Sequence, residues 1–439
     1  MQEKNTGKVV TRFAPSPTGL LHLGNYRTAI FAYLYAKKNK GSFVLRIEDT
    51  DRERSKKEYE ENIIESLKWL GLDYDKFYRQ SEHVGRHKFY LEKMIKEGNA
   101  YISKEEAKDG SGVIKELVRF KNPNIDVSFK DEIKGEVTMN TKDLGDFVIA
   151  KNLGEPLFHL AVVVDDFEAG VTHVIRGEDH VSNTPRQILI QRVIGAPTLI
   201  YAHMPLVLAP DKLKLSKRRG ALPLTEYKNR GFLPEAILNG VAFVGWNPGT
   251  EKEIFTRDEL IEAFELSRVQ KSPAVFSEEK LEWFNKEHIK LLSQEEIEKN
   301  ILEFLPNNMK NPRIIPVVLE RISKWGDVKD MADRGELNFF FSPPKIAKEK
   351  LIFKDTPPEK ISDNLKEAIA ALEKINGEDF TPENIKSALM ALADKMESRG
   401  EVLHPVRFAL SGLDKSPDPF IVASILGKNE TLSRLQKAV

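Results

Sequence analysis

The hydrophobic pattern near the N-terminus predicts a strand, a helix and a second strand in close succession. Residues 8–13 form a short, largely apolar segment, and residues 24–38 place their apolar positions at helical spacing. Residues 42–47 alternate loosely between apolar and polar and predict another strand. Because two parallel strands need a long crossover connection, this order predicts a βαβ unit and hence a parallel sheet.

Two further segments extend the α/β pattern. A second helix is predicted over residues 56–70, where Ser55 and Glu58 have the spacing of a capping box. Residues 160–164 form a continuous apolar run, which is typical of a strand buried on both faces.

The remaining N-terminal pattern predicts an interrupted domain. Residues 172–175 favour a strand, and residues 184–195 favour a helix that has Pro185 in its first turn and ends at glycine. Residues 100–155 are polar and lack long apolar periodicity. We therefore interpret them as an insertion within the α/β domain that does not belong to its sheet.

Beyond residue 225 the pattern becomes helical. Breaks rich in proline and glycine lie near 342–344 and 357–358. The predicted helices cover 234–244, 257–264, 277–285, 294–304, 314–324, 365–374, 381–396 and 419–426. The predicted fold is thus an α/β domain followed by a mostly α-helical C-terminal half.

Composition and charge narrow the class of protein. The 439 residues are enough for two to four domains. The absence of cysteine excludes disulfides, thiolate zinc sites, iron–sulfur clusters and a cysteine nucleophile. Apolar runs are far shorter than the ~20 residues that span a bilayer, and the first residues do not resemble a signal peptide. We therefore expect a cytoplasmic protein without a membrane segment. The equal numbers of basic and acidic residues, 67 each, favour a local basic patch over general nucleic-acid binding.

The turn after the first predicted strand is the place to look for a phosphate site, because ligands bind at the carboxyl ends of parallel strands. Gly-x-Gly-x-x-Gly does not occur in the chain. Residues 19–26 have the glycine spacing of a P-loop, but Asn25 and Tyr26 replace its lysine and hydroxyl residue. His22 and Gly24 remain at the start of a helix, which favours an anion. On its own, a histidine there is more often a capping or surface residue.

Residues 212–219 carry five basic side chains and no acidic one, and Gly220 follows. Such a segment suits a loop that closes over phosphates. Without other information, a solvated loop or a nonspecific nucleic-acid patch is the favoured interpretation of such a segment.

Together, the two segments are specific. His22-x-Gly24, followed by Lys-x-Ser-Lys-Arg at 214–218, resembles the signature pair of class I aminoacyl-tRNA synthetases. Flanking stretches narrow this resemblance to glutamyl-tRNA synthetases of the bacterial type; they are residues 12–19, 46–51, 174–179, 232–236 and 271–276. Residues 404–412 are similar to the final helical domain of that family.

The resemblance implies a two-step reaction in which glutamate and ATP form glutamyl-adenylate and the glutamyl group then moves to the terminal adenosine of tRNA-Glu. Mg²⁺ would arrive with ATP. His22 and Lys217 are implied as the catalytic residues that contact the phosphates. The implied ATP-binding residues are His22, Gly24, Asn25, Lys214, Ser216, Lys217 and Arg218. Asn25 stands where the broader class often has histidine.

The resemblance also implies the residues that bind glutamate. Arg12 would bind the side-chain carboxylate, Arg176 would contact the substrate, and Glu48 would bind the ammonium group. The full implied set is Arg12, Ala14, Ser16, Glu48, Phe158 and Arg176. Phe158 is a departure, since many relatives carry a tyrosine there, and its missing hydroxyl predicts a lower affinity for glutamate.

The same resemblance implies a domain plan. It consists of a Rossmann-like catalytic domain over 1–99 and 156–225, an α+β insertion over 100–155 for the tRNA acceptor end, a helical stem-contact domain over 226–325 and a helical anticodon-binding domain over 326–439. Many relatives bind zinc through cysteines in the insertion. Because this chain has no cysteine, no protein-bound metal is expected here. The expected partners are ATP, L-glutamate and tRNA-Glu, and the protein is expected to be a monomer.

Several alternative functions must be compared with glutamate–tRNA ligation. The first turn departs from that of glutaminyl-tRNA synthetases, which typically read Pro-Glu-Pro-Asn where this chain has residues 15–18. A glutamyl-queuosine tRNA synthetase or a small-molecule nucleotidyltransferase would lack the helical half. A non-discriminating enzyme that also charges tRNA-Gln with glutamate stays open. An inactive tRNA-binding paralogue is disfavoured by the intact Arg12, His22, Glu48 and Lys217.

Overall fold

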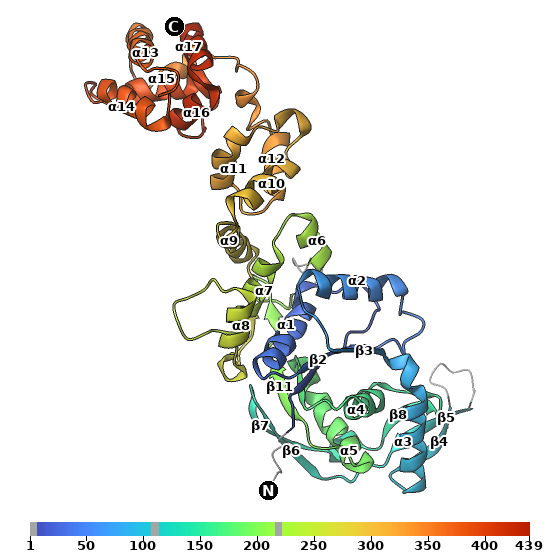
Figure 1. Cartoon of the computed structure of the whole chain (residues 1–439). Helices are drawn as coiled ribbons and strands as arrows, with labels where there is room; N and C mark the ends of the chain where they lie inside the picture. Colours follow the sequence, from blue (N-terminus) through green and yellow to red (C-terminus); the bar gives the residue numbers. More distant parts are fainter. Residues whose placement is uncertain (1–6, 107–113, 216–221) are drawn as a thin grey trace. The chain divides into compact units, whose positions relative to one another are not determined.

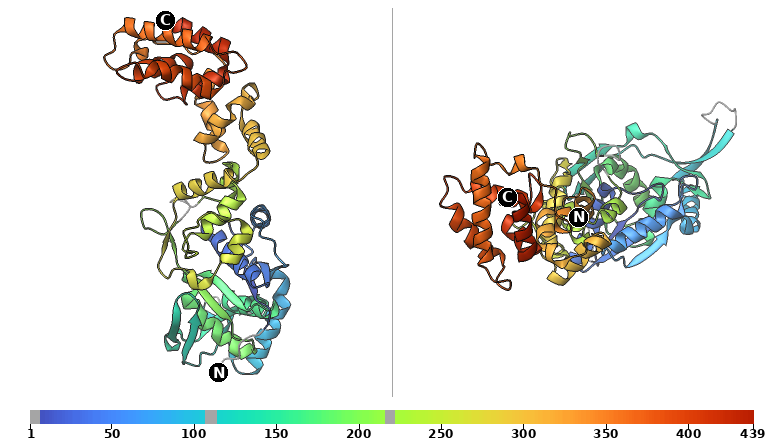
Figure 2. Two further views of the ribbon diagram at one scale, coloured as in Figure 1. Left: turned by 60° about the vertical axis from the view of Figure 1, so that its left-hand side comes forward. Right: turned by 90° about the horizontal axis from the view of Figure 1, so that it is seen from above.

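The computed structural model describes residues 7–106, 114–215 and 222–439. The chain divides into two compact units, residues 1–288 and 289–439, which we describe separately. Figure 1 and Figure 2 show the N-terminal unit in blue to yellow and the C-terminal unit in gold to red.

The N-terminal unit mixes strands and helices along the whole of its length. In chain order its elements are β1 (Val10–Phe13), α1 (Leu23–Lys38), β2 (Ser42–Ile47), α2 (Lys57–Trp69), β3 (Lys76–Arg79), α3 (Val84–Lys96), β4 (Ala100–Glu106), β5 (Ile114–Phe120), β6 (Asp126–Asp131), β7 (Gly135–Asn140), β8 (Phe147–Asn152), β9 (Glu155–Pro156), α4 (Phe158–Glu168), β10 (His173–Gly177), η3 (Glu178–Asn183), α5 (Thr184–Ile194), β11 (Ile200–Met204), β12 (Val207–Leu208), α6 (Leu224–Asn229), α7 (Pro234–Ala242), α8 (Arg257–Ala263), β13 (Ala274–Val275) and α9 (Glu278–Ile289).

The parallel strands form two groups that adjoin at β1 and β10. Strands β1, β2 and β3 pair in parallel, and so do β10 and β11. Where β1 meets the start of β10, the backbone N–H of Thr172 donates to the carbonyl of Val10 at 3.0 Å. Strand order therefore reverses between β1 and β10. The carboxyl ends of strands at such a switch point are where open α/β folds bind their ligands.

The two faces of the sheet bury different helices. Ile175 and Ala202 pack in a core with residues of α1, α2 and α7. Their sequence neighbours Val174 and Tyr201 pack in a second core with residues of α3, α4 and α5. Because successive side chains of a strand point to opposite faces, both faces of the sheet are covered by helices. The predicted α/β fold class is confirmed.

The interpretation of residues 160–164 as a strand is wrong, because they lie within α4. Every residue of this run is buried, as are Asp165 and Asp166 that follow it. A helix buried on all sides has no polar face, so its apolar run cannot be distinguished from a buried strand by periodicity. The β-branched valines then favour the wrong interpretation.

The expectation that the insertion lies outside the sheet is also wrong in part. Strands β4, β5, β8 and β9 form a separate antiparallel sheet. The β6–β7 hairpin, however, extends the main sheet, because Asp131 at the end of β6 pairs in parallel with Tyr201 of β11. The insertion thus contributes directly to the sheet that carries β10.

The predicted capping box before α2 does not form. The helix begins at Lys57, its N-cap is Lys56, and no side chain caps it. The Ser55 hydroxyl is buried instead. By contrast, α5 begins near Pro185 and ends at Gly195, whose left-handed φ of 78° terminates the helix as predicted.

The C-terminal unit contains helices and short 3₁₀ turns. Its α-helices are α10 (Gln294–Phe304), α11 (Ile315–Arg321), α12 (Gly326–Asp333), α13 (Pro358–Glu373), α14 (Pro382–Ala393), α15 (Gly400–Ser411), α16 (Pro419–Leu426) and α17 (Lys428–Ala438). Helices α13–α17 pack on one another and bury apolar stripes such as Leu365–Leu372 and Ile385–Leu389. The predicted helical C-terminal half is confirmed. Within the described ranges, no helix has the length and apolarity needed to cross a membrane.

Candidate active site

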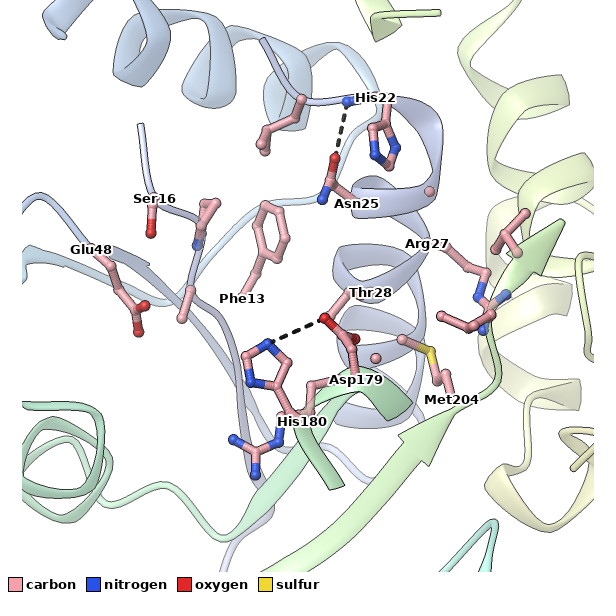
Figure 3. A pocket seen from close by; sticks show the side chains of 18 of the residues that line it. Phe13, Ser16, His22, Asn25, Arg27, Thr28, Glu48, Asp179, His180 and Met204 are labelled. Carbon is pink, nitrogen blue, oxygen red and sulfur yellow. Dashed lines mark hydrogen bonds and ion pairs between the residues drawn. The ribbon is translucent and has the colours of Figure 1, made fainter. Parts of the chain in front are cut away.

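A pocket of about 490 Å³ opens at the carboxyl ends of β1 and β10, where the strand order reverses. Figure 3 shows Glu48 and Ser16 at the left of the pocket, His22 and Asn25 at the top where α1 starts, and Asp179 and His180 below them. The pocket brings together every predicted site residue that the structure describes: Arg12, Ala14, Ser16, His22, Gly24, Asn25, Glu48, Phe158, Arg176 and Lys214.

Arg12 lies near the end of β1 and is 5% exposed. Its Nε donates to both carboxylate oxygens of Asp166, at 3.3 and 3.4 Å. Arg46 also donates to Asp166, from Nη1 at 2.5 Å. Burial by itself would raise the pKa of Asp166, but Arg46 and Arg12 outweigh it, so the pKa lies below its ordinary value. An ionised Asp166 therefore holds two guanidinium groups behind the pocket.

Glu48 follows β2 and lies at the pocket wall. Its Oε1 accepts hydrogen bonds from Nε and Nη2 of Arg46, at 3.3 and 3.1 Å. Its backbone N–H donates to the carbonyl of Pro15 at 3.0 Å, which ties the turn containing Ala14 and Ser16 to the end of β2. Burial raises the pKa of Glu48, although Arg46 and Arg12 oppose the shift.

Arg176 lies near the end of β10 and is 6% exposed. Its Nε donates to His203 at 3.1 Å, and its Nη2 donates to Thr184 and Gln187 at 2.9 and 2.8 Å. These partners carry no negative charge. Burial, followed by the neighbouring Arg12, lowers the pKa of Arg176 to about 10, so the guanidinium remains charged at neutral pH. A buried cation with neutral partners favours an anionic ligand.

The start of α1 is built by His22, Gly24 and Asn25. His22 is the N-cap residue, and its backbone N–H donates to Oδ1 of Asn25 at 3.1 Å. A Cβ atom on Gly24 would lie 3.1 Å from two atoms of the His22 ring. Glycine at this position therefore leaves room for the imidazole over the first helical turn. The helix N-terminus and the imidazole together favour a phosphate group.

Lys214 lines the same pocket from the segment after β12. Its backbone is held by a bridge to Leu208, and the next residue, Leu215, donates its N–H to the carbonyl of Val207 at 3.0 Å. The predicted residues Ser216, Lys217 and Arg218 lie outside the described residues.

Phe158 begins α4 and lines the pocket with 39% of its surface exposed. Its ring lies 5.6 Å from that of His180, which sequence reasoning did not select. Burial and the nearby Arg176 lower the pKa of His180 to about 4, so its imidazole is neutral at physiological pH. Asp179 also lines the pocket, 3.8 Å from His180 Nε2. Both residues belong to or follow the stretch 174–179 already noted in the sequence.

Asp166 was also missed. The signal that could have revealed it is the acidic pair that directly follows the apolar run 160–164. Two adjacent carboxylates after a fully buried segment need cationic partners, and arginines at nearby strand ends supply them.

The geometry suits a small zwitterion beside a phosphate. Near the ends of β1, β2 and β10 the pocket presents the guanidinium groups of Arg12 and Arg176 and the carboxylate of Glu48. Two cations and one anion complement a ligand with two carboxylates and one ammonium group. Across the described ranges, no group of three or more histidine, aspartate or glutamate residues is arranged to hold a metal ion.

Comparison with known proteins agrees with this geometry. Residues 8–110 and 102–283 match the model described as tRNA synthetases class I (E and Q), catalytic domain, and residues 277–439 match an anticodon binding domain. A glutamate–tRNA ligase of Aquifex aeolicus is 41% identical over 98% of this chain and 99% of its own length. The chain belongs to the glutamate–tRNA ligase family of class I tRNA synthetases.

Other members of this family give the same result. A glutamate–tRNA ligase of Thermodesulfovibrio yellowstonii is 40% identical over 98% of this chain and 99% of its own length. The crystal structure of a glutamate tRNA ligase from Elizabethkingia meningosepticum, in complex with its amino acid, superposes with a TM-score of 0.86 at 34% identity, over 98% of this chain and 99% of that one. The family resemblance found in the sequence is confirmed.

Proposed function

We propose that this chain ligates L-glutamate to tRNA-Glu in two steps through glutamyl-adenylate, converting ATP to AMP and diphosphate. The observation that carries this proposal is the placement of Arg12, Arg176 and Glu48 in one pocket beside the start of α1. The charges match the two carboxylates and the ammonium group of glutamate. The neighbouring helix N-terminus offers a site for the ATP phosphates, so the two reactants would meet there.

The binding roles follow from the charges. Arg12 would bind the side-chain carboxylate of glutamate through the part of its fork not engaged by Asp166, and Arg176 would bind a carboxylate from β10. Glu48 would accept the ammonium group. Ala14 and Ser16 would contact the substrate from the turn that the backbone of Glu48 holds in place.

The phosphates of ATP would lie at the start of α1, where His22, Gly24 and Asn25 contribute a donor, space and a fixed first turn. Lys214, Ser216, Lys217 and Arg218 would close over the phosphates. His22 and Lys217 would stabilise the charge that develops on the α-phosphate as the glutamate carboxylate attacks it. The reaction needs no covalent enzyme intermediate, and Mg²⁺ would enter with ATP as part of the substrate.

The rest of the chain would bind the tRNA. We propose a catalytic domain over 1–99 and 156–225, acceptor-end binding by 100–155, stem contacts by 226–325 and anticodon binding by 326–439. The match of residues 277–439 to an anticodon binding domain supports the last of these roles. We further propose that the protein acts as a monomer in the cytoplasm, without a protein-bound zinc ion.

Charging assays test the proposed activity. Purified transcripts of tRNA-Glu and tRNA-Gln are each incubated with ATP, Mg²⁺ and either glutamate or glutamine, and the acylated tRNA is measured. We expect glutamate to be attached to tRNA-Glu. Glutamate attached to tRNA-Gln as well would identify a non-discriminating enzyme. No acylation of either transcript, with ATP and the protein intact, would support the inactive paralogue instead.

Phe158→Tyr is expected to strengthen glutamate binding. The ring already lies at the pocket wall and is partly exposed, so a hydroxyl can be added without displacing a core side chain. One extra hydrogen bond stabilises a complex by about 0.5–1.5 kcal/mol, which predicts a roughly two- to tenfold lower KM for glutamate. Steady-state charging at varied glutamate checks this. An unchanged or higher KM would show that Phe158 does not face the bound amino acid.

A further inference from the structure

A buried chain of polar side chains runs from the insertion to Arg176. Asp131 ends β6, His203 lies in β11 and Arg176 lies in β10, and β11 lies between the other two strands. Asp131 Oδ2 is 2.6 Å from His203 Nδ1, and His203 Nε2 is 3.1 Å from Arg176 Nε. Asp131 is 1% exposed and His203 is not exposed at all. Only Arg176 reaches the pocket.

The hydrogen-bonding capacity of each group determines the proton positions. A guanidinium group only donates, so His203 Nε2 must accept from Arg176 Nε. His203 is therefore neutral, with its proton on Nδ1, and Nδ1–H donates to Asp131. Burial lowers the pKa of His203, in agreement with a neutral ring. Burial would raise the pKa of Asp131, but hydrogen bonds from His203 and from backbone N–H groups outweigh it and lower the pKa.

Asp131 is itself surrounded by donors. Its Oδ1 accepts from the backbone N–H groups of Ile133 and Lys134, at 2.9 and 2.7 Å. Its Oδ2 accepts from the backbone N–H of His203 at 3.0 Å, in addition to the imidazole. Both oxygens thus face N–H groups, so a side chain with only one oxygen at this position cannot satisfy them all.

The orientation of the Arg176 guanidinium group depends on these hydrogen bonds. Thr184 and Gln187 both bind Nη2, and Thr184 donates its own proton to the carbonyl of His180 at 3.1 Å. The Thr184 hydroxyl oxygen also lies 3.2 Å from His203 Nε2, next to the N–H of Arg176. Nε is bound by His203, whose ring connects the guanidinium to the negative charge of Asp131. Among the hydrogen bonds of the described residues, none involves Nη1, so this donor remains for a ligand in the pocket.

We propose that Asp131 and His203 are positioning residues for glutamate binding: Asp131 keeps the His203 proton on Nδ1, and His203 Nε2 thereby orients Arg176 toward the substrate. This inference rests on the proposed role of Arg176 as a substrate-binding arginine. It makes the inserted segment, whose proposed task is to bind the tRNA acceptor end, part of the amino-acid site as well.

Asp131→Asn tests the proposal, because it preserves the shape of the side chain and replaces one accepting oxygen with a donating amide group. An amide nitrogen facing His203 would donate to Nδ1 and move the ring proton to Nε2, where it would oppose the N–H of Arg176. We expect the Kd and the KM for glutamate to rise about tenfold to a hundredfold, the range found when groups that orient metal-binding histidines are removed. The KM for ATP should not change. Glutamate titration calorimetry and charging assays measure these values.

Asp126→Asn is the matched control. It makes the same substitution at the exposed start of β6, where the Asp126 carboxylate accepts from Asn140 at 2.6 Å. We expect its glutamate affinity to equal that of the wild type. A folded Asp131→Asn variant with wild-type glutamate affinity would overturn the proposal, as would an equal loss of affinity for glutamate and ATP.

The tautomer can be measured without any variant of Asp131. In ¹⁵N-histidine-labelled wild-type protein, the ring signals of His203, assigned by their loss in His203→Gln, should show a proton on Nδ1 and none on Nε2. A proton on Nε2 would overturn the proposal even if Asp131→Asn fails to fold. If the wild type binds no glutamate while the predicted tautomer is present, the proposed function fails and the hydrogen-bond chain stands.

Discussion

Arg12→Ala is expected to lower kcat/KM for glutamate by about two to three orders of magnitude, because truncating one partner of a buried, hydrogen-bonded charge pair costs roughly 2–5 kcal/mol. The substitution would remove the cation from the end of β1 and leave the side-chain carboxylate of glutamate without its partner. Discrimination between glutamate and glutamine should fall with it, since an uncharged amide loses less from the missing charge.

The variant is expected to fold. Asp166 would lose Arg12 but keep its 2.5 Å hydrogen bond from Arg46, so no isolated carboxylate is left in the interior. Arg192→Ala, at an exposed position on α5, is the matched control and should retain wild-type kinetics. Charging assays with glutamate and with glutamine give kcat/KM for glutamate and the discrimination between the two amino acids. Unchanged glutamate charging by a folded Arg12→Ala variant would show that another residue recognises the side chain.

Lys217→Ala is expected to lower the rate of adenylate formation by about a hundred- to a thousandfold, the usual effect of removing one group that stabilises transition-state charge. The affinity for ATP should change little, because the proposed contact forms only as charge develops on the α-phosphate. Lys217 follows closely on Lys214, which already lines the pocket.

The measurement is ATP–pyrophosphate exchange with glutamate and tRNA-Glu transcript present, at varied ATP. Lys228→Ala, on the exposed side of α6, removes a different positive charge and should behave as the wild type. A parallel loss in rate and in ATP affinity would indicate that Lys217 contributes ground-state binding and would contradict its transition-state role.

The local parts of the fold could be predicted from the sequence. The βαβ unit at residues 8–47 has clear periodicity, and β1, α1 and β2 form where it indicates. The residues at the start of α1 could be assigned to a phosphate site because they follow a predicted parallel strand. The glutamate-binding residues were predicted from the resemblance to the synthetase family; they are Arg12, Ala14, Ser16, Glu48, Phe158 and Arg176. The periodicity and the turn after the first strand involve only residues that are close together in the sequence, so both can be recognised without the structure.

The parts that depend on distant segments could not be predicted. Helix α4 is buried on all sides, so its apolar run lacks the polar face that would have identified a helix. The short strand β3 and strand β11 were not recognised for a related reason, since their pairing partners rather than their own sequences define them. Asp166 was missed together with α4, although it holds Arg12.

The hydrogen bonds that link Asp131, His203 and Arg176 also depend on distant segments and could not be predicted. They join residues of β6, β11 and β10, and no local pattern relates them. The insertion was interpreted as separate from the sheet, which hid the contact of Asp131 with β11. The role of a buried acid at the end of one strand can be inferred only when its neighbours in space are known.

The central claim is that the pocket at the switch point selects glutamate for reaction with ATP. The most direct test is ATP–pyrophosphate exchange by the wild-type protein, with tRNA-Glu transcript present, for glutamate, glutamine and aspartate in turn. We predict exchange with glutamate at a kcat/KM at least about a hundredfold above that for glutamine or aspartate. Glutamine lacks the carboxylate that would pair with a buried guanidinium group, and the shorter side chain of aspartate cannot reach all of the charged groups at once. Absence of glutamate-dependent exchange, or equal exchange with glutamine, would contradict the account.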